Sequence, residues 1–298
     1  MKKQNTLVGI ALLLFASFCF AIMGVLIRIV SETANNSSIV FFRNFYSLFI
    51  LLPLMFSAGW LTALTKPKIL GLHCVRGITG LAAMYGFFFA IAEMPLSKAM
   101  IFPYSASLFI PLIAWFWLKE KTLPVTYVYI ALGFIGVLFI VKPGADIVNW
   151  VALLGLLSSF MTAMAMVSIR LLGRTESAKH IALNFTIIST AVSLPIYLLN
   201  YQQLNQTAHL MLFAIGVLAA MAQLTMSRAY SIANAGSIAA IPYTAILFSG
   251  IWAYVLWDEV PVTSDLIGIS LIIIATLLTV FTNRLNKKRA QTKVVVLD

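Results

Sequence analysis

Two arginines inside long apolar segments are the side chains best suited to do chemistry in this sequence. Arg43 and Arg76 lie about 6 and 10 Å from the nearer ends of their segments if each segment forms a helix rising 1.5 Å per residue. A charged side chain inside hydrocarbon costs about 2.5–3.5 kcal/mol on insertion scales, so each arginine requires a compensating role. Arg76 is expected to contact an anionic substrate group or to bond backbone carbonyls. Arg43 is expected either to contact the same anionic group or to extend its side chain to the membrane–water interface.

Hydroxyl-bearing pairs follow prolines in two further apolar segments. In each segment the proline removes a backbone hydrogen bond and frees a carbonyl about four residues earlier. Unpaired backbone at that depth is tolerated only against protein or a wet cavity. The pairs are Tyr104–Ser105 and Tyr243–Thr244. We expect them to line a central cavity, the alternative being that their hydroxyls satisfy the backbone locally.

Four other polar or aromatic side chains are candidates for substrate contact. Gln223 and Asn184 could bind a substrate or hydrogen-bond neighbouring helices. Tyr85 lies about two and a half helical turns from Arg76, so the two side chains cannot both face one narrow cavity. Trp115 belongs either to the cavity or to an aromatic belt at the membrane interface.

Motifs for enzymatic chemistry are missing from the sequence. It contains no nucleotide-binding loop, metalloprotease motif or hydrolase nucleophile elbow, and its three histidines are isolated along the chain. No cofactor or metal is expected, and an intramembrane enzyme is the alternative from a different functional class. Since all nine acidic residues fall in loops or at span ends, facilitated diffusion or exchange is favoured over a buried carboxylate relay.

The composition identifies the elements that must position these residues. The chain has 298 residues, of which 61% are hydrophobic and 10% charged, and its mean hydropathy is +0.99. Soluble domains carry roughly 25% charged residues. We therefore predict an all-α integral membrane protein with ten transmembrane helices. The expected spans are 7–30, 39–58, 69–92, 97–118, 124–141, 149–171, 180–199, 208–231, 236–256 and 263–282.

The basic residues that give the chain its net charge of +11 are distributed as the positive-inside rule predicts. With a cytoplasmic N-terminus, most of the 20 basic residues fall on the inner side, and most acids on the outer side. We therefore expect a multi-pass protein of the cytoplasmic (inner) membrane with both termini cytoplasmic. Its expected partners are the lipid bilayer and a small-molecule substrate, with no nucleic acid. A monomer suffices if binding occurs within one chain, and a homodimer is also compatible.

Two halves of the chain resemble each other. One constant shift along the sequence aligns Ser17, Arg28 and Pro53 with Ser159, Arg170 and Pro195. A slightly smaller shift aligns Pro103, Tyr104 and Glu120 with Pro242, Tyr243 and Glu259. Five spans are an odd number, so the second copy enters the membrane from the opposite side and the repeat is inverted. The expected divisions are 1–147, 148–283 and a basic cytoplasmic tail, 284–298. The repeated arginines and glutamates near helix ends are expected to brace the structure.

The repeated motifs allow a family resemblance to be stated. They are Ile101-Phe102-Pro103-Tyr104 with Trp117-Leu118-Lys119-Glu120, and Ala240-Ile241-Pro242-Tyr243 with Leu256-Trp257-Asp258-Glu259. Over about residues 7–283 the chain resembles the EamA-type branch of the drug/metabolite transporter superfamily. Arg76-Gly77-Ile78-Thr79-Gly80 resembles members that carry cofactor-like metabolites. The second half has Phe185 and Ile215 in place of Arg43 and Arg76.

The resemblance implies a secondary transporter that works by alternating access. Its substrate would be a small organic metabolite, amino acid-like or cofactor-like. An intramembrane arginine favours a substrate bearing a carboxylate or phosphate. A broad-specificity drug or metabolite exporter is the alternative.

Overall fold

The computed structural model describes residues 6–53, 67–119, 123–141, 150–232, 238 and 241–295, and all regular structure within these ranges is helical. The α-helices are α1 (Thr6–Ser31), α2 (Asn36–Leu51), α4 (Pro67–Glu93), α5 (Leu96–Ala99), α6 (Phe102–Leu118), α7 (Pro124–Val141), α8 (Trp150–Leu172), α9 (Ala178–Leu199), α10 (Gln206–Ile232), α12 (Thr244–Trp257) and α13 (Thr263–Val295). A short 3₁₀ helix, η2 (Ile241–Tyr243), precedes α12.

The helices have the length and composition of membrane spans. Seven described segments are long and apolar enough to cross a bilayer, and two shorter apolar helices cover 124–140 and 241–257. The predicted all-α membrane architecture is therefore confirmed. Each of the ten expected spans overlaps a described helix, although α2, with 16 residues, is short for a span. The total of ten spans remains a prediction.

The fourth expected span is interrupted, and its proline begins a helix instead of breaking one. A continuous span over 97–118 was expected, but α5 ends at Ala99 and α6 begins at Phe102. Pro103 lies in the first turn of α6, where a missing N–H costs no intrahelical hydrogen bond. Pro242 lies in η2, directly before α12. In both segments this proline therefore lies at the start of an α-helix or directly before it, and does not interrupt the helix.

The two halves of the chain share local backbone geometry at equivalent positions. Asn35 caps α2 by accepting a hydrogen bond from the N–H of Ser38, and Ser177, the equivalent residue of the second half, caps α9 in the same way. Lys119 and Asp258, which are also equivalent, end α6 and α12 in the left-handed conformation with φ of 53° and 54°. These are the only non-glycine residues with positive φ in the ranges described.

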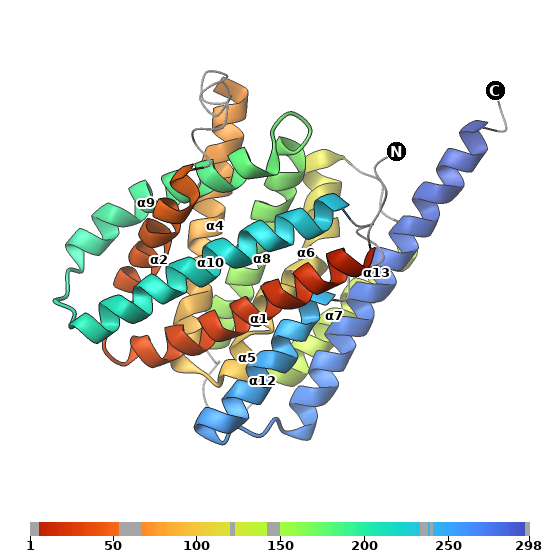
Figure 1. Ribbon diagram of the computed structural model, residues 1–298. Helices are drawn as coiled ribbons and strands as arrows, with labels where there is room; N and C mark the ends of the chain where they lie inside the picture. Colours follow the sequence, from red (N-terminus) through yellow and green to blue (C-terminus); the bar gives the residue numbers. More distant parts are fainter. Residues whose placement is uncertain are drawn as a thin grey trace.

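Helix packing follows a matching pattern in the two halves. α1 packs against α10 and α12, and α8 packs against α4 and α6. Likewise α2 contacts α10, and α9 contacts α4. α2 also packs on α9, and α7 on α13. Figure 1 shows α1 and α10 running side by side, with α13 extending beyond the bundle. This set of contacts stays unchanged when α1, α2, α4, α6 and α7 are exchanged for α8, α9, α10, α12 and α13 in that order.

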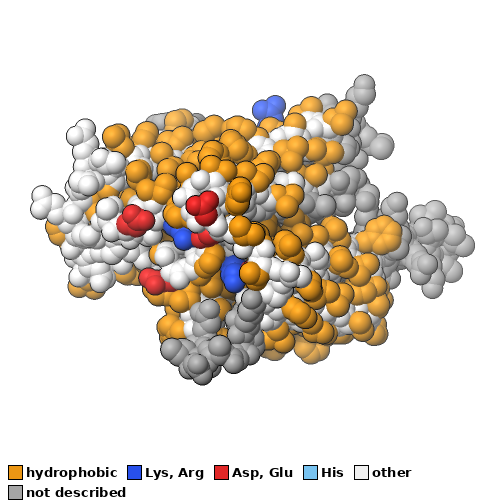
Figure 2. Space-filling model, turned by 90° about the horizontal axis from the view of Figure 1, so that it is seen from below, with side chains coloured by type: hydrophobic (Ala, Val, Ile, Leu, Met, Phe, Trp, Pro, Cys, Tyr) orange, Lys and Arg blue, Asp and Glu red, His pale blue; other side chains and the backbone are white. Residues whose placement is uncertain are grey.

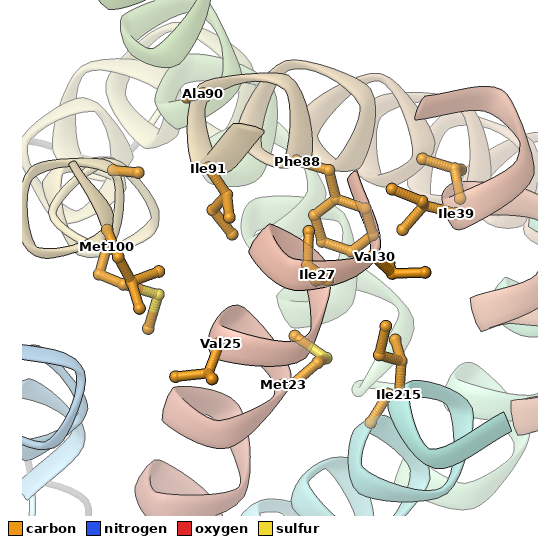
Figure 3. Packing of buried hydrophobic residues seen from close by; sticks show 14 of the residues in the cluster. Met23, Val25, Ile27, Val30, Ile39, Phe88, Ala90, Ile91, Met100 and Ile215 are labelled. Carbon is orange, nitrogen blue, oxygen red and sulfur yellow. The ribbon is translucent and has the colours of Figure 1, made fainter. Parts of the chain in front are cut away.

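The main apolar core lies where α1 meets α2, α4 and α10. Ile27 and Val30 of α1 point toward Phe88 and Ile91 of α4, with Ile39 of α2 beside them (Figure 3). In a membrane such contacts stabilise the bundle through close packing, because lipid tails are as apolar as the side chains. This core supports the segments of α2 and α4 that carry the buried arginines.

The packing of α7 against α13 depends on two glycines. A Cβ at Gly136 would lie 2.7 Å from the carbonyl oxygen of Gly268, and a Cβ at Gly268 would lie 2.6 Å from that of Gly136. Backbone atoms cannot rotate away, so either substitution must separate the helices. Gly250 of α12 has open space around its Cβ position.

We predict that Gly136→Ala and Gly268→Ala each destabilise the protein by about 1–3 kcal/mol, the usual cost of overpacking. Gly250→Ala should leave stability unchanged or raise it by up to about 1 kcal/mol, because alanine favours a helix interior more than glycine. Melting temperatures in detergent measure both effects. Equal stability of all three variants would contradict the close approach of α7 and α13.

Candidate functional site

The structure buries both predicted arginines between helices. Arg43 on α2 is 5% exposed and Arg76 on α4 is 8% exposed. α2 and α4 contact each other, and both pack against α9. The two guanidinium groups are therefore buried on neighbouring helices, in a part of the bundle that we call the arginine site.

Each guanidinium has a partial set of partners. Nη1 of Arg43 donates a 2.8 Å hydrogen bond to Oδ1 of Asn44, whose own amide donates to the carbonyl of Val40. The guanidinium of Arg76 lies 3.8 Å from the ring centroid of Phe185 on α9. Such a cation–π contact is worth about 0.5–2 kcal/mol, depending on exposure. Both arginines are thus partly stabilised by neutral groups.

Neither arginine has a carboxylate partner among the described residues. The ion pairs found there join other residues. The Nε atoms of Arg43 and Arg76 are buried and have no hydrogen-bond acceptor. A buried charge without a counter-charge is costly, so the arginine site is a place where an anion would be stabilised.

Two further polar side chains meet between α4 and α9. His73, one turn before Arg76 on α4, is fully buried, and its Nε2 lies 3.3 Å from Nδ2 of Asn184 on α9. Asn184 was a sequence candidate, and the structure has it linking two helices. His73 and Phe185 were missed. The only available signals were the three-residue spacing of His73 from Arg76 and the repeat alignment of Phe185 with Arg43.

The predicted tyrosines from the two halves meet at the helix interruptions. The rings of Tyr104 and Tyr243 lie 5.4 Å apart between centroids. Ser107 on α6 lies 3.4 Å from the hydroxyl of Tyr243 and 2.7 Å from that of Thr276 on α13. Neither Ser107 nor Thr276 was singled out from the sequence. This tyrosine pair is built from α6, η2 and α13 and is separate from the helices of the arginine site.

The remaining candidates have varied positions. Ser105 donates to the carbonyl of Ile101, and Thr244 donates to that of Ile241, which are local backbone bonds. Gln223 is half-buried on α10. The hydroxyl of Tyr85 is buried without a partner. Trp115 is 55% exposed on α6, beside the more exposed Phe116. The hydrogen bonds and ring contacts described for Arg43 and Arg76 involve none of these residues.

Charged side chains near helix ends form a second feature, which we call the ion-pair cluster. Arg28 at the end of α1 pairs with Glu259 after α12, and lies 4.6 Å from the ring of Trp257. The other oxygen of Glu259 accepts a 3.0 Å hydrogen bond from the N–H of Leu96. Lys98 on α5 pairs with Asp265 on α13 at 3.3 Å. Figure 2 looks onto this face, where acidic and basic side chains gather.

The ion-pair cluster contains one of the two repeated arginines and one of the two repeated glutamates that were expected to brace the structure. Arg28 and Glu259 come from different halves of the chain, as expected for a half-to-half contact. The equivalent glutamate, Glu120, lies outside the described residues.

Comparison with known proteins decides the family. The profile of the EamA-like transporter family matches residues 7–142 and again residues 149–281. The chain belongs to the EamA-like transporter family. As a member of the drug/metabolite transporter superfamily, this EamA-like protein is a multi-pass membrane transporter of small metabolites and not an enzyme.

Named relatives of this EamA-like protein cover nearly its whole length. It is 31% identical to the pseudopaline exporter CntI of Pseudomonas aeruginosa over 271 residues, which is 90% of this chain and 94% of the relative. It is 26% identical to the S-adenosylmethionine uptake transporter of Rickettsia felis, over 94% and 95% of the two chains. One crystal structure, 18% identical, matches with a TM-score of 0.60 over 92% of this chain and 96% of that one, which supports the fold alone.

Gly80 allows the position of the Arg76 side chain to be tested. A Cβ at Gly80 would overlap Nη1 of Arg76 and would lie 2.7 Å from the ring of Phe185. Because the end of a guanidinium can move, Gly80→Ala should displace Arg76 from Phe185 while the helices stay packed.

We predict that Gly80→Ala weakens transport about tenfold or more, because misplacing a charged hydrogen-bond donor costs about 1.5–3 kcal/mol. Gly71→Ala, on the same helix with open space around its Cβ, should transport normally. Uptake or efflux per folded molecule in reconstituted vesicles measures the difference. Normal transport by both variants would mean that the placement of Arg76 is not important.

Proposed function

We propose that this EamA-like protein carries a small organic metabolite bearing an anionic group, with Arg43 and Arg76 as its principal ligands. The metabolite is amino acid-like or cofactor-like, and its anionic group is a carboxylate or a phosphate. One observation carries the proposal: two guanidinium groups are buried on helices that contact each other, and the described part of the chain supplies no carboxylate to either.

Guanidinium chemistry supports this choice of substrate group. An arginine presents planar, forked N–H donors that match the two oxygens of a carboxylate or phosphate. A bound anion would accept from the unpartnered Nε atoms and would offset two positive charges in a region of low dielectric. The partial partners, Asn44 and Phe185, would hold the guanidinium groups in place while the site is empty.

We further propose that ten spans form a 5+5 inverted repeat, divided near residue 147, and that the carrier works by alternating access. Matched helix contacts, matched caps at Asn35 and Ser177, and the double match of the family profile all support the duplication. The positive-inside bias of the sequence favours cytoplasmic termini in an inner membrane. A single chain would contain the whole site, so a monomer would suffice.

In this mechanism the ion-pair cluster closes one face of the carrier. Both of its ion pairs join a helix of the first half to a helix or loop of the second half. Rocking one half against the other to open this face would require those pairs to part. The tyrosine pair, with one ring from each half, would lie at the same seam.

The direction of transport does not transfer from the relatives. One is named an exporter and the other an uptake transporter. Facilitated diffusion or exchange is the simplest scheme for the carrier, because no described carboxylate lies at the arginine site.

The substrate proposal is tested by ligand-induced thermal shift of the purified protein. The panel contains S-adenosylmethionine, succinate, histidine and AMP, together with the apolar cation tetraphenylphosphonium. An anionic or zwitterionic compound should stabilise the wild type. In Arg76→Gln its affinity should fall roughly ten- to hundredfold, as expected from the loss of about 1.5–3 kcal/mol.

Arg174→Gln is the matched control, because it removes the same charge from an exposed position after α8. It should bind like the wild type. Arg76→Lys separates charge from shape, and weak binding by the lysine variant would favour forked recognition. If only tetraphenylphosphonium stabilises the protein, and Arg76→Gln responds equally, the anion proposal is wrong and a broad-specificity exporter is favoured.

The role of the ion-pair cluster is tested by a double-mutant cycle. Arg28→Gln and Glu259→Gln should each lower stability, with a coupling energy of about 1 kcal/mol for this partly exposed pair. Each should also increase labelling of Ser107→Cys by an impermeant thiol reagent, in a background with Cys19 and Cys74 replaced by serine. Glu93→Gln, which removes an exposed carboxylate at the end of α4, should do neither. Unchanged labelling in all variants would mean that the cluster stabilises the structure but does not control access to Ser107.

A further inference from the structure

The two halves of the chain share their helices but not all of their helix contacts. α6 has the same length as η2 and α12 together, and both segments, like α7 and α13, begin at positions related by the shift that aligns Tyr104 with Tyr243. α6 packs against α7 and α13, whereas the equivalent contacts of α12 with α13 and α7 are weaker. α1 also packs more closely on α4 than its equivalent, α8, packs on α10. The structure is therefore an asymmetric arrangement of two similar halves.

A network of hydroxyl groups joins α6 to the second half of the chain. Oγ of Ser107 on α6 lies 2.7 Å from Oγ1 of Thr276 on α13 and 3.4 Å from the hydroxyl of Tyr243 in η2. Ser107 donates its own proton to the carbonyl of Tyr104, in the preceding turn of α6. A hydroxyl has one proton and two lone pairs, so Ser107 accepts from the other two side chains. We call Ser107, Tyr243 and Thr276 the hydroxyl triad.

The equivalent positions of the other half cannot form such a network. The shift that aligns the tyrosine pair also aligns Ser107 with Ile246. It aligns Thr276 with Val137. Ile246 and Val137 are each 5% exposed and belong to one apolar cluster, against which Tyr104 packs. Neither side chain has a hydrogen-bonding atom, so at these positions the bonds between α6 and the second half have no counterpart between α12 and the first half.

We propose that the hydroxyl triad favours the conformation of this structure over the second conformation that alternating access requires, with Ser107 and Thr276 as positioning residues for the transport cycle. This inference rests on the proposed function, since it needs two conformations to choose between. In an inverted repeat the second conformation arises when the two halves exchange their arrangements. α12 would then take the place of α6, and Ile246 would face the first half without a hydrogen bond.

The membrane environment sets the size of this preference. A threonine that loses its interhelical partner can turn to a carbonyl of its own helix, so the net loss is modest. The measured strengths of interhelical hydrogen bonds in membrane proteins correspond to about a three- to twentyfold change in an equilibrium. Such a factor decides which conformation the empty carrier prefers. It is also small enough for a substrate with a modest difference in affinity between the two conformations to reverse it.

The preference has a consequence for transport from the two sides of the membrane. The apparent affinity of a substrate falls with the fraction of carrier that is in the binding-competent conformation. Substrate should therefore bind more tightly from the side that this conformation exposes. An uncoupled carrier gains no net direction in this way, because a preference between its own conformations does no work. Weakening the hydroxyl triad should reduce the difference between the two sides.

The experiment measures the ratio of the two conformations by double electron–electron resonance on the full-length protein in lipid nanodiscs. Two equivalent pairs of spin labels, each joining the two halves, are placed on exposed residues near helix ends in a background without the native cysteines. The substitutions are Glu32→Cys with Val255→Cys for one pair, and Arg174→Cys with Phe116→Cys for the other. Because the pairs are equivalent, an exchange of the two arrangements should also exchange their distances.

Ser107→Ala and Thr276→Val should each lower the ratio of this conformation to the other about three- to twentyfold. Tyr243→Phe keeps the aromatic ring and removes the longer contact, so it should act in the same direction with the smallest effect. Ser249→Ala and Thr279→Val are matched controls, because both hydroxyls are buried and donate to a carbonyl of their own helix. Both controls should leave the ratio unchanged.

A gain of the network in the other half separates this inference from a general loss of stability. Val137→Thr combined with Ile246→Ser would build a second triad with Tyr104, and should also lower the ratio. Two distance populations whose ratio is the same in the wild type and in the Ser107→Ala and Thr276→Val variants would overturn the inference alone. A single distance for each label pair in every variant would contradict alternating access itself, and the inference with it.

Discussion

Every polar group inside this bundle must find its partner within the protein, because hydrocarbon supplies none. Most of the buried hydroxyls meet that constraint by donating to a carbonyl in the preceding turn of their own helix, as Thr79 and Thr186 do. Ser47 instead donates across to the carbonyl of Gly216 and so joins α2 to α10. Nine buried side-chain atoms of the described residues have no hydrogen-bond partner, and the Nε atoms of Arg43 and Arg76 are two of them. The proposed anion site makes use of this partial pairing of two cations.

The resemblance between the two halves extends to the framework but not to this site. The two halves share helix contacts, caps and the left-handed ends of α6 and α12. The arginines occur in the first half only, and at the position equivalent to Arg43 the second half has Phe185. That phenylalanine stacks on Arg76. The aromatic ring at the position equivalent to one arginine therefore packs on the other arginine, and the two halves of the chain differ at this site.

The sequence could predict most of the fold because a membrane chain must display its spans as apolar runs, and most of these matched the helices to within about two residues. The larger differences are that α2 ends at Leu51 where 58 was expected, that α12 begins at Thr244 where 236 was expected, and that α13 continues to Val295 where 282 was expected. It also singled out Arg43, Arg76 and Asn184, which the structure buries, since polar residues stand out against such runs. It could not identify Phe185, because one aromatic among 21 phenylalanines has no distinguishing pattern. The break before α6 was misjudged because Pro103 suits the first turn of a helix as well as an interruption.

The two groups of charges differ in a way that suits a carrier. At the helix ends, Arg28 has a carboxylate, a ring and a carbonyl as partners, so its charge is fully occupied in joining the halves. Inside the bundle, Asn44 and Phe185 compensate the arginines only in part. Full compensation would leave no binding energy for a substrate, and no compensation would leave two charges too costly to bury. On the proposed function, an intermediate level keeps the empty carrier folded and would let an anion bind without being held too tightly to leave.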